Sequence, residues 1–285
     1  MNKACVVTGV STGIGRAIAR RMIAAGWHVF GSVRREADAA SLRAEFADKA
    51  TPLLFDVTDE AAVKAGAAVV AQALGPKARL GGLVNNAGVA VAAPMLHVPL
   101  ADLRYQLEVN VVAQVSVTQA FAPLIGSDRT REGEPGRIVN MLSIAGRLAP
   151  PFVGPYAASK HAMEAITDAL RRELRIYGVD VIGIEPGSVA TPIWDKAESV
   201  DYSSLLQTDY AASGKKLRDM MISDGRRGMK PEVIGEAVFK ALTAARPPAR
   251  IAPVFERLKN WTLPRLLPDR AMDAVVAKMF GLKRL

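Results

Sequence analysis

Near its N-terminus the chain reads Thr8-Gly9-Val10-Ser11-Thr12-Gly13-Ile14-Gly15. The apolar run Ala4–Thr8 predicts a strand that leads into this sequence, and the residues near 14–26, rich in Ala, Arg and Ile, predict a helix after it. Glycines at such a turn permit the backbone angles and the close approach that a pyrophosphate requires, while the helix N-terminus supplies N–H groups and a positive dipole end. Because a strand comes first, a dinucleotide site is favoured over the alternative, which is close packing of the strand on the helix.

The end of the second predicted strand, His28–Ser32, indicates which dinucleotide binds. An acidic side chain about 20 residues further on would bond the ribose 2′-hydroxyl of NAD, whereas an arginine accommodates the 2′-phosphate of NADP. Val33 stands where the acid is expected, and Arg34 and Arg35 follow it, with Ser32 as a helper. Forked guanidinium donors suit a phosphate, so NADP(H) is favoured over NAD(H). The alternative is a basic strand end that is simply solvated.

The order of apolar and helix-like segments predicts the fold class. Apolar runs bounded by glycines alternate with stretches of helical periodicity, which is typical of βαβ units and a parallel sheet. The predicted strands are Ala4–Thr8, His28–Ser32, Thr51–Phe55, Gly82–Asn85, Arg137–Met141 and Val179–Glu185. Helices are predicted near residues 14–26, 37–47, 59–74, 100–125, 156–177 and 231–245. We expect an α/β protein with a doubly wound parallel sheet of the Rossmann type in three α/β/α layers. It forms a single domain over residues 1–250, with a helical C-terminal extension over residues 251–285 packed on it.

Composition argues against several classes of protein. The chain has 285 residues, half of them hydrophobic, and no signal-peptide pattern or run of eighteen uncharged apolar residues, so we expect a cytoplasmic protein with a sizeable core. Cys5 is the single cysteine and the three histidines stand far apart, so neither a disulfide nor a metal site is expected. The net charge of +9 accompanies only 6% aromatic residues and no basic recognition motif, so no nucleic-acid partner is expected.

Tyr156 and Lys160 stand four residues apart in a predicted helix, and Ser143 lies thirteen residues before Tyr156. Residues four apart share a helix face, so the Lys160 ammonium can lower the pKa of the Tyr156 phenol from its usual value of about 10. Such a phenol can exchange a proton with an alcohol or a developing alkoxide, and Ser143 would hold the same oxygen by a hydrogen bond. On spacing alone, an exposed tyrosine beside a solvated lysine is the more ordinary interpretation, so the other motifs decide.

Taken together, the motifs resemble the classical short-chain dehydrogenase/reductase family. The resemblance covers roughly residues 3–192 and depends on the order of the motifs. They are Thr8–Gly15, Asp56-Val57, Asn85-Asn86-Ala87-Gly88, Asn110, Ser143, Tyr156 with Lys160, and Pro186-Gly187-Ser188-Val189-Ala190-Thr191. Jointly they are very specific.

The resemblance implies a role for each catalytic residue. Tyr156 would be the general acid/base and Ser143 would orient the substrate oxygen. Lys160 would lower the tyrosine pKa and bond the nicotinamide ribose. Asn110 would hold a water in the proton relay, with a helix-bend contact as the alternative.

The resemblance also implies which residues bind the cofactor. Asp56 would bond the adenine, Asn86-Ala87-Gly88 would line the cofactor, and Thr191 would meet the nicotinamide amide. The whole expected set is Gly9, Ser11, Thr12, Gly13, Ile14, Gly15, Arg34, Arg35, Asp56, Val57, Asn86, Ala87, Gly88, Asn110, Tyr156, Lys160, Pro186, Gly187, Val189 and Thr191.

The expected function is reversible interconversion of a carbonyl and an alcohol by hydride transfer, with NADP usually meaning reduction. The rival is a cofactor-sensing or scaffold protein that keeps the fold without turnover, against which the intact Ser143, Tyr156 and Lys160 argue. The predicted helices near 100–125 and 156–177 match those that pair subunits in the family, so a homo-oligomer, a dimer or tetramer, is expected.

Substrate specificity in the family resides chiefly in the segment after the Pro-Gly motif, here about residues 193–229. A segment of this length beside a site is expected to be a lid. Its aromatic and methionine residues are Trp194, Tyr202, Tyr210, Met220 and Met221. Apolar residues at 91–96 and 144–153 would add walls, so a hydrophobic, moderately bulky substrate is expected, with ordinary core packing as the alternative.

The C-terminal tail is basic and amphipathic. From Arg257 to Leu285 there are seven Lys and Arg against two Asp, a net charge of +5 that is more than half of the total. Apolar residues recur at helical spacing between Asp269, a candidate cap, and Gly281, a stop; they are Met272, Val275, Val276, Met279 and Phe280. The tail resembles the C-terminal extensions of the steroid and retinol dehydrogenase branch. A cover over the pocket or a subunit contact is favoured over peripheral contact with an anionic membrane.

Overall fold

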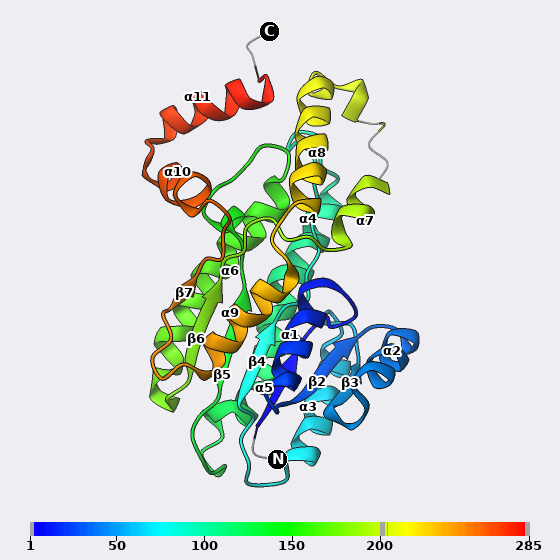
Figure 1. The fold of residues 1–285 in the computed structure, drawn as a ribbon, viewed down its shortest axis with the longest axis vertical. Helices are drawn as coiled ribbons and strands as arrows, with labels where there is room; N and C mark the ends of the chain where they lie inside the picture. The colour runs from blue at the N-terminus through cyan, green and yellow to red at the C-terminus, as the bar shows by residue number, and fades with distance from the viewer. Residues whose placement is uncertain (1–2, 200–202, 204, 283–285) are drawn as a thin grey trace.

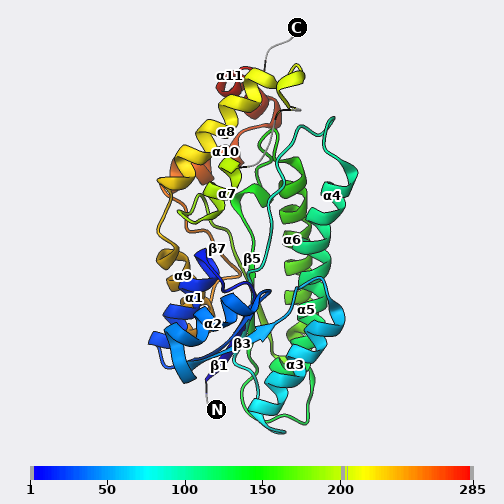
Figure 2. The same cartoon turned by 90° about the vertical axis from the view of Figure 1, so that its right-hand side faces the viewer.

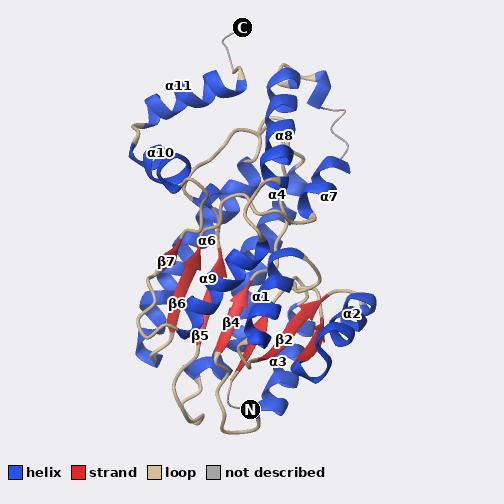
Figure 3. Ribbon diagram, viewed as in Figure 1, coloured by secondary structure: helices blue, strands red, loops and turns tan. Residues whose placement is uncertain are grey.

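A seven-stranded parallel sheet forms the centre of the molecule (Figures 1 and 3). The computed structural model describes residues 3–199, 203 and 205–282. The strands are β1 Ala4–Val7, β2 His28–Val33, β3 Ala50–Leu54, β4 Gly82–Asn85, β5 Arg137–Met141, β6 Asp180–Ile184 and β7 Arg250–Ile251. Their order is β3-β2-β1-β4-β5-β6-β7, and neighbouring strands are parallel. The strand order reverses between β1 and β4, which confirms the predicted doubly wound sheet.

Helices cover both faces of the sheet (Figure 2). One face carries α1 Gly13–Ala24, α2 Glu36–Phe46 and α9 Pro231–Thr243, and the other carries α3 Glu60–Leu74, α5 Ala113–Ala122 and α6 Gly154–Glu173. The helix α1 packs on α9, and α3 packs on α5. The predicted three-layer, single-domain fold is confirmed, and the predicted elements differ from these mainly at their ends, where helices fray.

The central strands β1, β2, β4, β5 and β6 are largely buried on both faces, which explains their nearly continuous apolar sequences. All four residues of β1 are buried. One core cluster, which includes Ile18 and Ile234, packs between the sheet and α1, α2 and α9, and a second, which includes Phe121, packs beneath α3 and α5. Burial raises the pKa of Cys5 to about 12, so this residue stays a neutral thiol in the core, as its place in the first apolar run predicted.

Residues 100–127 form one long helical path. It joins α4 Leu100–Leu107, a π-helical turn at Glu108–Val112, α5, and a second π-helical turn at Pro123–Ser127. Among the described residues it is the one helix long and apolar enough to cross a membrane by composition, but 56% of its most apolar window is buried inside the protein. Its composition is therefore that of a core helix, and the two π-helical turns are features that the sequence did not indicate.

The second half of the chain contains elements that were not predicted. The strand β7 adds a two-residue edge beside β6. The segment 193–229, expected as a lid without helices, contains α7 Ile193–Ser199 and α8 Ala211–Arg226. The buried residues of α8 follow helical spacing, but several are small, which hides the pattern; they are Ser213, Gly214, Leu217, Ile222 and Gly225. Tyr202, expected in this lid, lies outside the described residues.

The C-terminal extension lies with α7 and α8 beyond the carboxyl ends of the strands (Figure 1). After a π-helical turn at Leu258–Thr262 it forms α10 Leu263–Leu266 and α11 Asp269–Phe280. Pro268 occupies the N-cap of α11, so Asp269 is the first helical residue and not the expected cap. Gly281 ends the helix with φ of 72°, in the left-handed region that favours glycine, as predicted.

The helix α11 is docked on the rest of the molecule chiefly by the buried Phe280, with Val276 of the same helix packed beside it. Phe280 is buried in a small cluster with Leu217 of α8 and with Phe152, which lies four residues before Tyr156. The Tyr210 ring stands edge-on to Phe152, with 5.5 Å between ring centres. The end of the chain therefore reaches the neighbourhood of the predicted catalytic residues.

Candidate active site

The carboxyl edge of the sheet brings Ser143, Tyr156 and Lys160 together. Ser143 follows β5 and begins a short 3-10 turn, where its Oγ accepts a hydrogen bond from the Ala145 N–H at 3.1 Å. Tyr156 and Lys160 lie one turn apart on α6, with Lys160 Nζ 5.7 Å from the centre of the tyrosine ring. The Ser143 hydroxyl lies close enough to the Tyr156 phenol to lower the pKa of the phenol. The three side chains that the sequence singled out therefore form one constellation.

Burial sets the acid–base properties of this constellation. It raises the pKa of the Tyr156 phenol, and the neighbouring Ser143 hydroxyl opposes this only in part. Burial also lowers the pKa of Lys160 to about 8, and Lys160 Nζ donates to the Met141 carbonyl at 2.7 Å. The expected lowering of the Tyr156 pKa by Lys160 is therefore not observed, because the ammonium bonds the end of β5 and not the phenol. A phenol with a raised pKa stays protonated at neutral pH, as a proton donor must.

Asn110 lies on the first π-helical turn, fully buried, and its amide is occupied by protein groups. Its Oδ1 accepts from the Val89 N–H at 2.8 Å, and its Nδ2 donates to the Val89 carbonyl at 2.9 Å and to Ser159 Oγ at 3.1 Å. Ser159 Oγ in turn donates to the Tyr156 carbonyl at 2.7 Å. The side chain thus ties the loop after β4 to α6. Its part in a water relay stays a prediction.

A seam of polar residues on the long helix was missed by the sequence reasoning. Gln106, Gln114 and Thr118 stand with Asn110 at intervals of four residues, and all four are buried. The three missed side chains bond residues between Asn85 and Val91 at 2.6–3.2 Å. A polar side chain at every fourth position of an apolar helix is the signal that indicates such a seam. It fixes the loop that runs from the end of β4 over the start of α6.

The glycine turn has the geometry of a pyrophosphate site. Gly9 and Gly13 have φ of 70° and 59°, and a Cβ on Gly15 would lie 2.1 Å from the Gly9 carbonyl oxygen. The first turn of α1 contains no acidic residue, and the N-cap, Thr12, makes no side-chain capping bond. The first N–H groups of α1 thus have no side-chain partner at the cap, and a diphosphate there would meet N–H donors and a positive dipole end. The residues present therefore fit a dinucleotide.

Further predicted cofactor residues surround this turn. Ser11, Thr12 and Gly13 border a cavity of about 420 Å³. Ile14 faces the other way and packs against the core cluster beneath α1. A Cβ on Gly13 would lie 3.3 Å from Thr191, so the threonine after β6 stands directly against the turn. The glycine turn and Thr191 therefore lie together, as the dinucleotide hypothesis requires.

The segment after β4 supports the glycine turn from the side. Asn86 Nδ2 donates to the carbonyls of Thr8 and Gly9 at 2.8 and 3.1 Å, and Thr8 Oγ1 accepts from the Ala87 N–H at 2.9 Å. A Cβ on Gly88 would lie 3.1 Å from Asn110 Oδ1. These residues link the cofactor turn to the polar seam of the long helix.

The segment after β6 is held by backbone bonds. The Gly187 N–H donates to the Pro253 carbonyl at 3.1 Å, and the Pro186 carbonyl accepts from the Ile144 N–H at 3.1 Å. Val189 pairs with Met229 in an isolated bridge. The Pro-Gly motif thus connects the catalytic serine loop to the start of the C-terminal extension.

The end of β2 differs in detail from the expectation. Ser32 Oγ accepts from the Gly9 N–H at 3.0 Å, so it supports the glycine turn and is not a free helper for a phosphate. Arg35 bonds Asp38 through Nε and a terminal nitrogen at 2.8 and 3.0 Å. Arg34 is exposed and lies 3.6 Å from Asp56 Oδ2. Of the two predicted phosphate ligands, Arg34 is therefore the one whose guanidinium is held less tightly by another side chain.

Asp56 caps its own turn, which is the ordinary role for an aspartate after a strand. Its Oδ1 accepts from the Thr58 N–H and hydroxyl at 3.0 and 2.9 Å. Burial raises the pKa of Asp56, but the Thr58 hydrogen bonds and the Arg34 charge outweigh burial and leave the pKa below its usual value. The carboxylate stays ionised, with its Oδ2 toward Arg34, and the neighbouring Val57 is buried in the core. A bond from Asp56 to an adenine stays a prediction.

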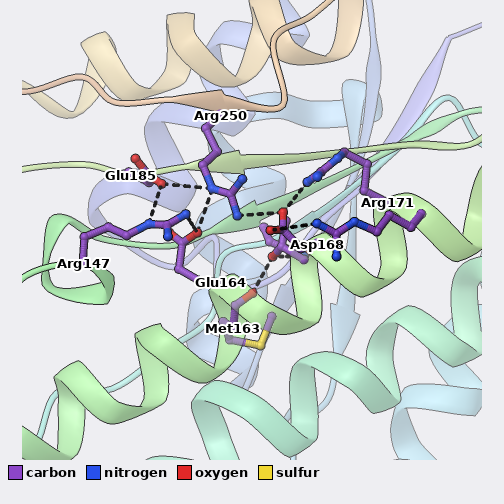
Figure 4. A network of polar contacts seen from close by, with 10 residues as sticks. Arg147, Met163, Glu164, Asp168, Arg171, Glu185 and Arg250 are labelled. Atoms are coloured by element: carbon purple, nitrogen blue, oxygen red, sulfur yellow. Dashed lines mark hydrogen bonds and ion pairs between the residues drawn. The ribbon is translucent and has the colours of Figure 1, made fainter.

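A buried ion-pair network lies behind the catalytic residues (Figure 4). Arg147, four residues after the catalytic serine, and Arg250 of β7 both donate to Glu164 Oε2 at 2.8 Å. Glu185, next to the Pro-Gly motif, lies 3.2 Å from Arg250 and 3.7 Å from Arg147. Arg250 also bonds Asp168 at 2.8 Å. Because Glu164 follows Lys160 by one turn of α6, the network fastens the serine loop, α6, the Pro-Gly segment and β7 to one another.

The fold and this site define the class of protein. A doubly wound parallel sheet with a glycine turn after β1, and with serine, tyrosine and lysine at its carboxyl edge, is the arrangement of a nicotinamide dinucleotide-dependent oxidoreductase. The sequence profile of the family described as short chain dehydrogenase matches residues 3–201. The chain belongs to this family, whose members interconvert carbonyl and alcohol groups, and the predicted resemblance is confirmed.

Individual relatives agree with this assignment. The chain is 41% identical to an NADPH-dependent 3-dehydrocapnine reductase from Ornithobacterium rhinotracheale, over 98% of this chain and 97% of that protein. It is 32% identical to retinol dehydrogenase 5 from Mus musculus, over 95% of this chain and 86% of that protein. A crystal structure of a short chain dehydrogenase/reductase from Burkholderia phymatum in complex with NAD superimposes with a TM-score of 0.74, at 26% identity, over 100% of this chain and 96% of that one. The predicted likeness to the retinol dehydrogenase branch is thus confirmed.

Proposed function

We propose that this protein reduces a ketone on a hydrophobic molecule with NADPH, and that Tyr156 donates the proton. The observation that carries the proposal is the position of the Ser143 hydroxyl beside the Tyr156 phenol, whose pKa it lowers, with Lys160 one turn away on the same helix face. The choice of NADPH is supported by Arg34 at the end of β2 and by the relative that is named for NADPH dependence. The choice of reduction is supported by the same relative, which is named a reductase.

The side chains of this site have distinct tasks in the proposed reduction. Ser143 and Tyr156 both bond the carbonyl oxygen, so negative charge that develops there meets donors already in place. A bound nicotinamide supplies the hydride. Tyr156 passes its phenolic proton to the resulting alkoxide, which releases an alcohol. Lys160 uses one of its three N–H donors on Met141, which leaves two to bond the cofactor ribose and to stabilise the phenolate.

A hydrophobic substrate is supported by the side chains around the start of α6. Phe152 precedes the catalytic tyrosine and carries Tyr210 against its ring, and the Tyr210 ring also contacts His97 at 5.9 Å. Met95 lies against Gly154, where a Cβ would meet its sulfur at 2.5 Å. Since apolar side chains from three segments gather here, we propose a ketone with an extended apolar part.

Replacement of the tyrosine tests the proposal. Tyr156→Phe keeps the ring and removes the proton donor, so ketone reduction with NADPH should fall by about 10²- to 10⁴-fold. NADPH affinity, measured by cofactor fluorescence, should change little. The matched control is Tyr177→Phe, which removes a phenol hydroxyl far from the site and should leave turnover unchanged. Substantial residual turnover in Tyr156→Phe would refute the role of the phenol.

The same assay tests the rival hypothesis of a dinucleotide sensor without turnover. A sensor would bind NADPH equally well in both variants and would reduce none of a panel of short, branched and long-chain ketones. Time-dependent loss of NADPH absorbance with any ketone, abolished in Tyr156→Phe, excludes the sensor.

A further inference from the structure

The segment 255–267 presents large apolar side chains to solvent. The exposed residues are Phe255, Leu258, Leu263, Leu266 and Leu267, and Phe255 and Leu266 are exposed by 70% and 73%. Trp261 in the middle of the segment is buried, with the Arg265 guanidinium 4.5 Å over its ring. The tryptophan thus anchors the segment from inside while its other apolar residues face outward. A group of exposed apolar side chains of this kind marks an interaction site.

The charge of the same region indicates which kind of partner fits it. The segment 255–267 contains Arg257, Lys259 and Arg265 against Glu256, a net charge of +2, and all four side chains are exposed. The sequence from Arg257 onward has a net charge of +5, and Arg270 and Lys278 are exposed as well. Apolar side chains flanked by cations are complementary to a surface that offers hydrocarbon next to negative charge. An anionic lipid bilayer has both properties.

The structure gives separate tasks to the two halves of the extension. The helix α11 is docked against α8 and Phe152 by Phe280 and Val276, while Val275 and Met279 of the same helix stay exposed. The preceding segment, 255–267, lies at the same end of the molecule (Figures 1 and 2). Most of its large apolar side chains are exposed. The two rival explanations of the tail were a cover over the site and a contact with a membrane. We assign the cover to α11 and the membrane contact to residues 255–267.

This end of the molecule also carries the candidate catalytic side chains. The catalytic side chains lie at the carboxyl edge of the sheet, and the C-terminal extension lies beyond that edge (Figure 1). We propose that the segment 255–267 docks on an anionic lipid bilayer, so that ketones dissolved in the bilayer reach the active site without crossing water. The proposed docking depends only on the exposed apolar and basic residues of this surface, whereas the proposed delivery of substrate also rests on the proposed function.

Co-sedimentation with vesicles tests the docking on the full chain. The wild type should sediment with vesicles of phosphatidylcholine and phosphatidylglycerol, and less with phosphatidylcholine alone. Phe255→Ser/Leu266→Ser should lower the bound fraction at least about ten-fold, because it removes the two most exposed apolar anchors of the segment. Arg257→Glu/Lys278→Glu should weaken binding to the anionic vesicles only. The matched control is Val69→Ser/Ile176→Ser, which removes two exposed apolar side chains outside the extension and should bind as the wild type does.

Activity measurements separate docking from delivery. With a short, water-soluble ketone, Phe255→Ser/Leu266→Ser should turn over as the wild type does, which also shows that it is folded. With a long-chain ketone carried in anionic vesicles, the same variant should lose roughly ten-fold in rate. If vesicle binding holds but neither ketone is reduced, the proposed function fails and the docking stands.

Two results would overturn the docking itself. One is a wild type that stays in the supernatant with anionic vesicles, or a serine variant that still binds them fully. The other is a wild type that binds no vesicles and forms an oligomer, while light scattering shows that the serine variant forms a smaller particle. The exposed face would then join copies of this chain.

Discussion

Arg34 and Arg35 stand side by side at the end of β2, but their guanidinium groups are not equivalent. Arg35 already forms two hydrogen bonds to Asp38, whereas Arg34 has a single ion pair at 3.6 Å to Asp56. A guanidinium that is already paired has to give up those bonds before it can bind a phosphate. We therefore expect Arg34, and not Arg35, to bind the 2′-phosphate.

The prediction at this site is that Arg34→Ala lowers kcat/KM for NADPH by roughly 10- to 100-fold, since a hydrogen bond to a charged group contributes about 1.5–3 kcal/mol. The value for NADH should change little, because NADH has no 2′-phosphate. Steady-state rates with both cofactors give the ratio. Arg35→Ala is the control and should alter that ratio much less. An unchanged ratio in Arg34→Ala would mean that another group selects the cofactor.

Single residues also show where sequence reasoning stops. Spacing was sufficient to find Ser143, Tyr156 and Lys160, because i and i+4 on a helix and the end of a strand are local geometry. The pKa of Tyr156 was not predictable, because it depends on burial and on the partner that Lys160 takes, which is the Met141 carbonyl. The occupied amide of Asn110 likewise depends on a loop twenty-one residues away in the chain.

At the scale of elements, the ion-pair network joins parts of the site that are distant in sequence. Arg147 belongs to the serine loop, Glu164 to α6, Glu185 to the end of β6 and Arg250 to β7. Two carboxylates and two guanidinium groups held this closely are sensitive to the loss of any member, because the partner left behind would be a buried unpaired charge. The network therefore fixes the relative positions of four elements that carry the chemistry.

The network leads to a prediction about pH. Burial, and next the neighbouring Glu164, raise the pKa of Glu185 from 4.5 to about 7. A carboxyl with a raised folded-state pKa binds more protons in the folded than in the unfolded chain, so its contribution to stability is lost as the pH rises through about 7. Glu185→Gln should therefore flatten the fall in Tm of the wild type between about pH 5 and 8, measured by calorimetry.

Glu164→Gln is the companion variant for this titration. It removes the negative charge that Arg147 and Arg250 share, so it should lower Tm. Because Glu164 also helps to raise the pKa of Glu185, the same variant should move the pH-dependent fall in Tm to lower pH. Parallel Tm profiles for the wild type and Glu185→Gln would show that Glu185 does not titrate in this range.

Elements with strong periodicity were predictable and the others were not. The six longer strands and the helices of the three layers follow from apolar runs and 3.6-residue spacing. The strand β7 has two residues, too few for a pattern, and forms because it extends the edge at β6. The helix α8 was missed because glycine and serine occupy part of its buried face, where Gly225 lies against Trp194.

At the scale of the whole molecule, the C-terminal extension packs the end of the chain against residues from the middle of the sequence. Phe280 meets Leu217 and Phe152 in a cluster separate from the two main cores. The Leu282 N–H donates to the Ala277 carbonyl at 2.9 Å across Gly281, which ends α11 with its aromatic residue turned inward. Because the cluster is small and lies outside the main cores, α11 can detach without unfolding the sheet.

Phe280→Ala tests this arrangement. Phenylalanine to alanine in a core costs about 3–5 kcal/mol, more than a small cluster of this kind is expected to hold, so α11 should detach while the sheet stays folded. Hydrogen exchange should rise in residues 269–280 and not in β1 or β4, and Tm should change by only a few degrees. KM for a hydrophobic ketone should rise several-fold as Phe152 loses its cover, with little change in NADPH affinity. The control is Met279→Ala, an exposed neighbour on the same helix, which should leave exchange and KM unchanged. If Phe280→Ala lowered Tm strongly and raised exchange in the sheet as well, the extension would be an integral part of the core and not a separate cover.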